Sequence, residues 1–322
     1  MSSRTPFFSI IIPLYNRRSR IDSAVHSVLS QAFTDWELII VDDASTDGSW
    51  EHIQSYTDQR IRVLRNEVNS ERCVTRNKGI ATAKGEYICF LDSDDYHLSN
   101  HLEALHSFIS SQLRKKAFFF TNAWDEDEQG NRTERHCPNL IKYDPFIYFL
   151  RYTVNPQRWA VHRLVMQRQL FDPAINICED MDTSLRIVAY GVPVYQLTER
   201  TTCYVAAADS FTHGAPDKWE RELANLKRIF TKPELKDLLP KKETDRLLSM
   251  CHFHLAQIAF EKNDLSNVRK HVFRSFLLCP SGYNGKTNIP LSVMLLYSLP
   301  FLGPLVRRVN KTRNLSTHFN RK

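Results

Sequence analysis

The chain has 322 residues, of which 42% are hydrophobic and 25% charged, and this is the composition of an ordinary globular protein. At a typical size of roughly 150 residues per domain, the length suggests about two domains. The seven cysteines are scattered and none has Cys-x-x-Cys spacing, so neither a disulfide framework nor a cysteine zinc site is expected. A reducing compartment fits, and the N-terminus shows no long apolar stretch of the kind found in secretory signals.

The net charge of +7 is unevenly distributed along the chain. Residues 1–213 hold 23 basic against 27 acidic residues, whereas residues 214–322 hold 20 against 9, and no acidic residue follows Asp264. A basic excess indicates a membrane surface or nucleic acid as partner. Because this excess lies in the tail, away from the motifs below, we expect a membrane surface and no nucleic acid.

Buried strands and amphipathic helices alternate along the first half of the chain. Near-continuous apolar runs, typical of strands covered on both faces, occur at 7–13, 38–41, 61–64, 87–91 and 117–121. Segments with helical periodicity or helix-start residues lie between them, near 19–29, 45–53, 70–83 and 100–113, and Gly85 suits the C-terminal cap of the third. This alternation predicts an α/β domain with a mainly parallel sheet.

The second half has a mixed order. Gly130-Asn131 predicts a hairpin turn within 128–132, followed by a helix at 179–190 and strands at 193–197 and 201–206. From about residue 216 the pattern is helical, and 246–262 with 265–278 resembles one helical-repeat hairpin, which we interpret as a cap on the N-terminal domain. We therefore divide the chain into a domain of residues 1–213 and a basic helical region of residues 214–322.

Polar clusters directly follow three of the predicted strands: Pro13–Asn16, Asp42–Gly48 and Asp92–Asp95. The carboxyl ends of parallel strands meet at one edge of a sheet, where ligands bind. Carboxylates gathered there repel one another unless a cation is present. Oxygen ligands such as Asp92 and Asp94 suit Mg²⁺ or Mn²⁺, which usually binds a substrate phosphate as well. An isolated Asp-x-Asp is a weak signal, but the ordered set is specific.

Four segments carry a family resemblance: residues 9–17 (SIIIPLYNR), 36–49 (WELIIVDDASTDGS), 76–95 (RNKGIATAKGEYICFLDSDD) and 179–180 (ED). Together they resemble the family 2 glycosyltransferases, an inverting group with the GT-A fold. The resemblance implies a nucleotide-diphospho-sugar transferase sandwich. It also implies a nucleotide-sugar donor, most often a UDP-sugar, and a divalent metal, Mn²⁺ or Mg²⁺, that bridges the aspartate motif and the diphosphate.

The resemblance also implies roles on the donor side. The nucleotide base is expected to lie against Pro13, Tyr15 and Asn16 and to donate a hydrogen bond to Asp43. Arg76 matches the basic residue near the nucleotide and its phosphates. Asp94 is expected to bind the metal directly, with Asp92 nearer the ribose and Asp95 facing the sugar.

On the acceptor side, Glu179-Asp180 matches the family's acidic pair at the start of a helix. Inversion needs a base that takes the proton of the attacking hydroxyl, and we assign it to Asp180, with Glu179 binding the acceptor or supporting the base. Asp182 is close enough in sequence to be confused with it. The alternative is that these acids only stabilise a helix N-terminus.

Two further residues are weaker candidates. His213 follows the last predicted strands, where some family members place a metal-binding histidine, and the alternative is a structural histidine. Trp159 is the last residue of the segment 155–159, which sits where family members place acceptor-side residues, and it either stacks on a sugar or packs in the core.

Residues 289–306 contain no charge but are interrupted by proline and glycine, and a basic cluster follows up to residue 313. Such a segment attaches at a membrane interface, packs on the protein or spans the bilayer, in that order of preference. Interfacial attachment would suit a cytoplasmic enzyme that is peripheral on the inner face of the membrane and acts on a glycan or lipid-linked acceptor in surface polysaccharide synthesis.

Two rival functions remain at this point: a nucleotidyltransferase of related fold, and a non-catalytic nucleotide- or glycan-binding module. A nucleotidyltransferase is expected to carry a glycine-rich basic loop after the first strand, which residues 13–17 (PLYNR) lack. The Gly-x-Gly-x-x-Gly and Walker sequences are absent, which disfavours a dehydrogenase or a P-loop ATPase.

Overall fold

The computed structural model describes residues 5–206 and 217–280. These residues form two compact units, and each is described by itself. The first unit comprises residues 5–206 and 233–238, and the second comprises 217–232 and 239–280. The domain boundary that we expected near residue 213 lies outside the described residues.

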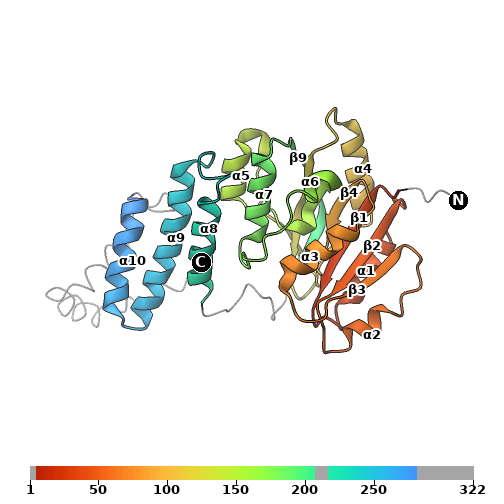
Figure 1. Ribbon diagram of the computed structural model, residues 1–322, viewed down its shortest axis with the longest axis horizontal. Helices are drawn as coiled ribbons and strands as arrows, with labels where there is room; N and C mark the ends of the chain where they lie inside the picture. The colour runs from red at the N-terminus through yellow and green to blue at the C-terminus, as the bar shows by residue number, and fades with distance from the viewer. Residues whose placement is uncertain (1–4, 207–216, 281–322) are drawn as a thin grey trace. The chain divides into compact units, whose positions relative to one another are not determined.

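The first unit is built on a mixed sheet, which has nine strands within the described residues (Figure 1). The strands in chain order are β1 (Phe8–Leu14), β2 (Trp36–Asp42), β3 (Ile61–Arg65), β4 (Tyr87–Phe90), β5 (Tyr96–His97), β6 (Phe118–Glu126), β7 (Arg132–Glu134), β8 (Trp159–His162) and β9 (Val194–Val205). Their spatial order is β3-β2-β1-β4-β8-β6-β9-β5, and β7 pairs with β6 alone.

The predicted α/β fold is confirmed, and the parallel part of the sheet is its N-terminal half. Strands β3, β2, β1 and β4 are all parallel, with Ile10 of β1 between Leu38 and Cys89. Beyond β4 the sheet is mixed, because β8 runs antiparallel to both β4 and β6 while β6 and β9 are parallel. The two strands expected at 193–197 and 201–206 are one strand, since β9 pairs along β6 through a register irregularity around Asn122.

Helices cover both faces of the sheet. The helices of the first unit are α1 (Ile21–Leu29), α2 (Ser49–Ile53), α3 (Glu71–Thr82), α4 (His101–Ser111), α5 (Pro145–Arg151), α6 (Arg163–Met166) and α7 (Glu179–Ala189). Apolar side chains of α1, α2 and α4 share one buried core with alternate residues of β1 and β2. Helix α3 packs on the opposite face, where Gly79 lies against Ile11.

Gly85 is required by close packing rather than by a helix cap. Helix α3 ends at Thr82, and a Cβ atom at Gly85 would lie 2.5 Å from the backbone nitrogen of Ser9. The Gly85 amide also donates a hydrogen bond to Ser9 Oγ at 2.8 Å. The turn before β4 therefore passes so close to β1 that no side chain fits between them.

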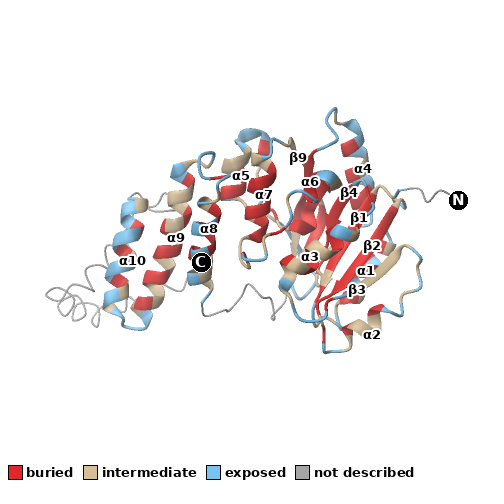
Figure 2. Cartoon of the chain, viewed as in Figure 1, coloured by how far each residue is buried: buried red, intermediate tan, exposed pale blue. Residues whose placement is uncertain are grey.

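The second unit is helical, as the sequence predicts. It contains α8 (Lys218–Phe230), α9 (Lys241–Glu261) and α10 (Leu265–Leu278). Helices α9 and α10 form a hairpin whose small core consists of Ala256, Ala259, Val268 and Val272 (Figure 2). Within 5–206 and 217–280, no helix combines the length and apolarity that crossing a bilayer requires. The segment 289–313, for which we predicted membrane contact, is outside the described residues.

Candidate active site

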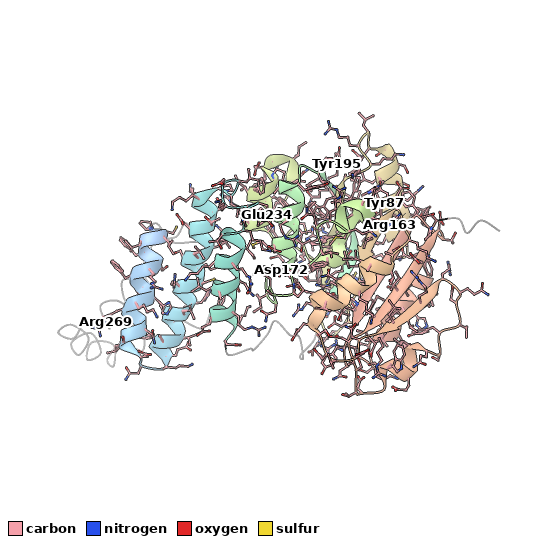
Figure 3. The ribbon with its side chains drawn as sticks, in the orientation of Figure 1. Tyr87, Arg163, Asp172, Tyr195, Glu234 and Arg269 are labelled. Atoms are coloured by element: carbon pink, nitrogen blue, oxygen red, sulfur yellow. The ribbon has the colours of Figure 1, made fainter. Side chains whose placement is uncertain are left out.

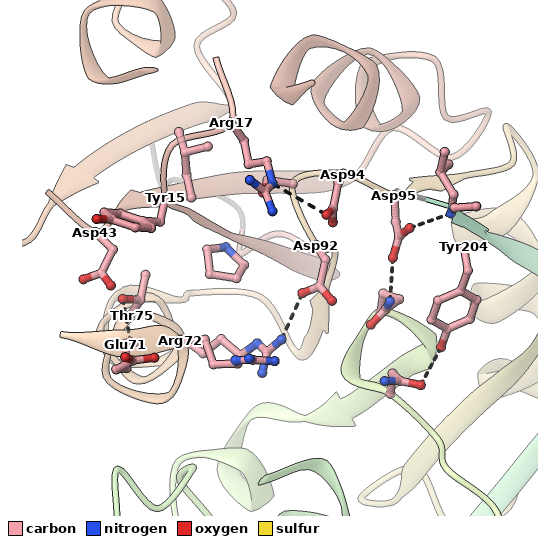
Figure 4. A pocket seen from close by; sticks show the side chains of 18 of the residues that line it. Tyr15, Arg17, Asp43, Glu71, Arg72, Thr75, Asp92, Asp94, Asp95 and Tyr204 are labelled. Carbon is pink, nitrogen blue, oxygen red and sulfur yellow. Dashed lines mark hydrogen bonds and ion pairs between the residues drawn. The ribbon is translucent and has the colours of Figure 1, made fainter. Parts of the chain in front are cut away.

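A cavity of about 860 Å³ opens at the carboxyl ends of β1, β2 and β4 (Figure 4). Seven of the predicted site residues line it: Pro13, Tyr15, Asp43, Arg76, Asp92, Asp94 and Asp95. Four others, Asn16, Trp159, Glu179 and Asp180, do not line it, and His213 is outside the described residues. Residues far apart in sequence meet here because Tyr15, Asp43 and the Asp92–Asp95 cluster follow strands whose carboxyl ends reach the same edge of the sheet, and Arg76 joins them from helix α3.

The two acids after β2 have different environments. Asp42 is fully buried and forms an ion pair with Arg65 at 3.2 Å. Asp43 lines the cavity, and its Oδ1 accepts hydrogen bonds from Asn66 Nδ2 at 2.7 Å and from the Ser70 amide at 2.9 Å. Among the described residues, Asp43 Oδ2 has no hydrogen-bond partner. Asp43 therefore presents one oriented acceptor atom at the cavity wall.

Asn16 joins two loops instead of lining the cavity. Its backbone has φ of 50°, and its amide donates to Ser45 Oγ at 3.0 Å. Its side-chain oxygen accepts a hydrogen bond from the Thr46 amide at 2.8 Å. These two hydrogen bonds tie the loop after β1 to the loop after β2, and Asn16 is not among the residues that line the cavity.

Arg76 bridges two carboxylates from different parts of the chain. Its side chain is 3% exposed, and it donates from Nη2 to Asp92 at 2.9 Å and from Nη1 to Glu179 at 3.1 Å. Burial by itself would lower the pKa of Arg76, but the charges of Asp92 and Glu179 raise it. Arg76 is expected from the sequence to approach the donor phosphates, whereas here its terminal nitrogens fix Asp92 and the start of α7.

Asp94 is partly exposed, as is Asp92, the other acid of the Asp-x-Asp pair. Its Oδ2 lies 3.6 Å from Arg17 Nε, and its side chain is 26% exposed. Burial and then the charge of Asp92 raise the pKa of Asp94. Arg17 was not predicted as a site residue, although it directly follows the Pro13–Asn16 cluster and ends the matching segment 9–17.

The acids fit a hard divalent cation that also binds a substrate. Asp92 and Asp94 line the same cavity and repel each other, as the raised pKa of Asp94 indicates. Within the described part of the chain, no three His, Cys, Asp or Glu side chains are grouped closely enough to hold a metal ion. Magnesium-type sites typically use one or two carboxylates and complete their coordination with water and substrate phosphates.

Asp95 is held by the protein on both of its oxygens. Oδ2 accepts a hydrogen bond from Gln157 Nε2 at 2.7 Å, and Oδ1 accepts one from the Val205 amide at 2.8 Å. Burial and the charge of Asp92 raise the pKa of Asp95 well above its usual value. Although Asp95 lines the cavity, its main contacts join the loop after β4 to the end of β9, and neither Gln157 nor Val205 was predicted.

Glu179 and Asp180 begin α7 after Cys178, whose φ of 67° turns the chain sharply into the helix. Glu179 contacts Arg76 and lies 3.5 Å from Arg72, which both line the cavity. Burial, and then the charge of Glu179, raises the pKa of Asp180 to about 7. Asp182 is fully buried and pairs with Arg186 at 2.9 Å within the helix, so of the neighbouring acids Asp180 is the better candidate for a base.

Trp159 belongs to the core. Its side chain is 0% exposed, its indole nitrogen donates to the Val154 carbonyl at 2.8 Å, and its ring stacks on Phe171. The interpretation of Trp159 as a sugar-stacking residue is therefore wrong, since no face of the ring is available.

The far end of the cavity is formed by the β6–β7 hairpin and β9, which the sequence did not mark as functional. Arg135 forms an ion pair with Asp125 at 2.5 Å, and its guanidinium lies 4.0 Å from the centre of the Tyr204 ring. All three residues line the cavity. They combine charged hydrogen-bonding groups with an aromatic ring, opposite the end that holds Asp43 (Figure 4).

Comparison with known proteins identifies relatives of this site. The model of glycosyl transferase family 2 matches residues 9–168. TuaG of Bacillus subtilis (strain 168), named as a teichuronic acid biosynthesis glycosyltransferase, is 34% identical over 224 residues, which cover 68% of this chain and 86% of TuaG. WfgD of Escherichia coli, a UDP-Glc:α-D-GlcNAc-diphosphoundecaprenol β-1,3-glucosyltransferase by name, is 40% identical over 111 residues, or 34% of this chain and 43% of WfgD.

Among solved structures, Staphylococcus aureus TarS (residues 1–349, with UDP-GlcNAc) superimposes with a TM-score of 0.61 at 18% identity, covering 83% of this chain and 81% of that one. The fold is thus that of the GT-A-type transferases. With the family match and the similarity to TuaG, the chain belongs to glycosyltransferase family 2.

Proposed function

We propose that the protein is an inverting, metal-dependent glycosyltransferase that moves a sugar from a UDP-sugar to a glycan or lipid-linked acceptor in surface polysaccharide synthesis. The observation that carries the proposal is the meeting of Asp43, Asp92 and Asp94 in one cavity at the strand ends. The name of TuaG supports a role in polysaccharide synthesis, and that of WfgD supports a lipid-linked acceptor. The UDP-GlcNAc in the TarS structure supports a UDP-sugar as donor.

On the donor side, Pro13 and Tyr15 bound the place of the base, and Asp43 Oδ2 accepts a hydrogen bond from it. Asp94, with Asp92 beside it near the ribose, holds Mn²⁺ or Mg²⁺. When bound, the metal supplies charge stabilisation for the departing diphosphate. Asp95 keeps the sugar end of the cavity in shape through Gln157 and Val205. His213 remains a proposed metal ligand.

On the acceptor side, Asp180 takes the proton of the acceptor hydroxyl as that oxygen attacks the anomeric carbon. The bond from the anomeric carbon to the diphosphate oxygen breaks on the opposite face, so the configuration inverts. A pKa of about 7 suits this role because a base works best when its pKa is near the working pH. Glu179 and Arg76 position Asp180 by fixing the first turn of α7.

We also place the enzyme in the cytoplasm, peripheral on the inner face of the membrane. Two observations support this location. Residues 289–306 are uncharged and a basic cluster follows up to residue 313, and the name of WfgD includes a lipid-linked acceptor.

The test is release of UDP and transfer of sugar by wild-type protein, Asp180→Asn and the surface control Glu103→Gln, over a panel of UDP-sugars with Mn²⁺. We expect Asp180→Asn to lower kcat by about 100-fold or more with donor affinity unchanged, because a general base contributes about 10²–10⁴ in rate. Glu103→Gln, an exposed change on α4, should match wild type. Undiminished turnover of Asp180→Asn would exclude Asp180 as the base, and a wild-type protein that binds UDP-sugars without turnover would favour the binding module.

A further inference from the structure

The outer face of α10 carries large apolar side chains that are exposed to solvent. Phe273, Phe276 and Leu277 are 61%, 51% and 62% exposed. At 100° per residue they fall within one arc of the helix, and single exposed hydrophobic residues are ordinary whereas a contiguous group of them indicates an interaction site. We call the exposed residues of this arc, namely Arg269, Lys270, Phe273, Arg274, Phe276 and Leu277, the α10 outer face.

The opposite side of α10 is fixed on α9. Val268 and Val272 are buried against Ala256 and Ala259. Ser275 is fully buried, and its Oγ donates to the Ser249 carbonyl at 3.0 Å. Because the buried side is packed and hydrogen-bonded, α10 cannot rotate to hide its phenylalanines, and the α10 outer face is the side presented outward (Figure 2).

Basic residues border the apolar group. Arg269, Lys270 and Arg274 are exposed on the same arc (Arg269 is labelled in Figure 3), and the helix contains no acidic residue. Apolar side chains that include phenylalanine, placed beside Lys and Arg on one helix face, form the pattern with which helices bind in the plane of an anionic membrane.

We infer that the α10 outer face is a docking surface for an anionic lipid bilayer, with the phenylalanines among the acyl chains and the basic residues at the headgroups. The inference rests on the proposed function in one respect: docking would bring the enzyme to a lipid-linked acceptor. It also assigns membrane contact to a described helix of the protein rather than to the tail alone.

The positive charge of the α10 outer face favours an anionic membrane over the other surfaces that could cover it. A second copy paired through the same face would bring Arg269, Lys270 and Arg274 against their own like charges. The remaining segment of this chain, residues 281–322, has seven basic residues and no acidic one, so it offers no complementary charge either. Anionic headgroups supply that charge, and acyl chains supply a place for the aromatic rings.

The test is sedimentation of the full chain with phosphatidylglycerol/phosphatidylcholine vesicles and with phosphatidylcholine vesicles, in the absence of donor and acceptor. Two variants, Lys270→Ala/Arg274→Ala and Phe273→Ser/Phe276→Ser, change the face. The matched controls are Lys115→Ala/Lys116→Ala and Leu113→Ser, which alter exposed residues after α4. Circular dichroism melting and UDP release are measured for every variant.

We expect wild type to bind the anionic vesicles and only weakly the neutral ones. The Lys270→Ala/Arg274→Ala variant should bind about 30-fold more weakly, since each basic residue near such a surface contributes about fivefold. The Phe273→Ser/Phe276→Ser variant should lose at least about tenfold in vesicle affinity, and the controls should bind as wild type does.

Vesicle binding by both face variants at wild-type strength overturns the inference. So does a lower melting temperature or a changed oligomeric state in the serine variant without loss of vesicle binding, because the face would then be covered by protein. UDP release reports separately on the transferase proposal.

Discussion

Arg76 connects the donor-side residues of the site with the acceptor-side acids by two ion pairs. It is buried, and it joins Asp92 after β4 to Glu179 at the start of α7. Removal of one partner from a buried ion pair typically costs about 3–5 kcal/mol, because the remaining charges are left uncompensated. Arg76→Met should therefore lower the free energy of unfolding by an amount in this range, measured by urea denaturation.

The control for this prediction is Arg76→Lys, which keeps the charge but cannot bind two carboxylates as a planar fork. It should recover part of the stability and restore less of the activity. A loss below about 1 kcal/mol for Arg76→Met would show that the bridge does not hold the site together.

Asp180 makes the activity depend on pH in a defined direction. Burial and the charge of Glu179 raise its pKa to about 7, so the carboxylate form that accepts a proton is lost as the pH falls through this value. We expect kcat/KM to decrease below about pH 7 with unit slope. Glu179→Gln removes the neighbouring negative charge and should move this acidic limb to lower pH.

The raised pKa of Asp180 also makes the free energy of unfolding depend on pH. Because the folded pKa of Asp180 lies above its unfolded value, its protonated form favours folding, and stability from this group declines as the pH rises from about 4 to about 7. A pH profile of kcat/KM that is flat from pH 5 to 8, or a limb that Glu179→Gln moves to higher pH, would contradict the assignment.

The sequence identified cavity residues that directly follow a predicted strand, but not those that other parts of the chain contribute to the cavity. Asp43, Asp92 and Asp94 could be found because each follows an apolar run. Tyr204 and Val205 carry no local pattern, and only the tertiary fold brings them to the cavity. Arg76 lines the cavity and Asn16 does not, and the protein groups to which both are hydrogen-bonded could not be identified from sequence.

At the scale of elements, the close approach of the turn before β4 to β1 is the most constrained contact. A Cβ atom at Gly85 would lie 2.5 Å from the backbone nitrogen of Ser9, and backbone cannot move aside as a flexible side chain can. Overpacking of this kind costs about 1–3 kcal/mol or more. Gly85→Ala should therefore lower the urea midpoint, while Gly191→Ala is a less suitable control because Gly191 has φ of 77°.

A better control is Ser111→Ala at the exposed end of α4, which should change the free energy of unfolding by no more than about 0.5 kcal/mol. If Gly85→Ala were as stable as this control, β1 and the turn would not pack as closely as described.

The elements themselves were predictable to different degrees. The β1–β4 half follows from apolar runs alternating with amphipathic segments, because consecutive parallel strands need helical crossovers. The mixed half does not, since β8 inserts between β4 and β6 by pairings between residues distant in sequence. Periodicity also divided β9 in two, because exposed polar residues near Glu199 interrupt its apolar pattern while its pairing with β6 continues.

For the whole molecule, the net charge of +7 describes neither unit. The catalytic part is slightly acidic and gathers carboxylates around its cavity, whereas the basic excess belongs to the C-terminal part and includes the α10 outer face. In the mechanism that we propose, metal would meet the negative charge of the donor locally, and the positive charge of the C-terminal part would face a membrane.

The central claim is transfer of a sugar from a UDP-sugar with inversion at the anomeric carbon. The most direct measurement is the proton NMR spectrum of the product formed from an α-linked UDP-sugar, in the presence of Mn²⁺ and with EDTA as control. We expect a β-linked product that forms with Mn²⁺ and not with EDTA. An α-linked product, or transfer that proceeds equally in EDTA, would contradict it.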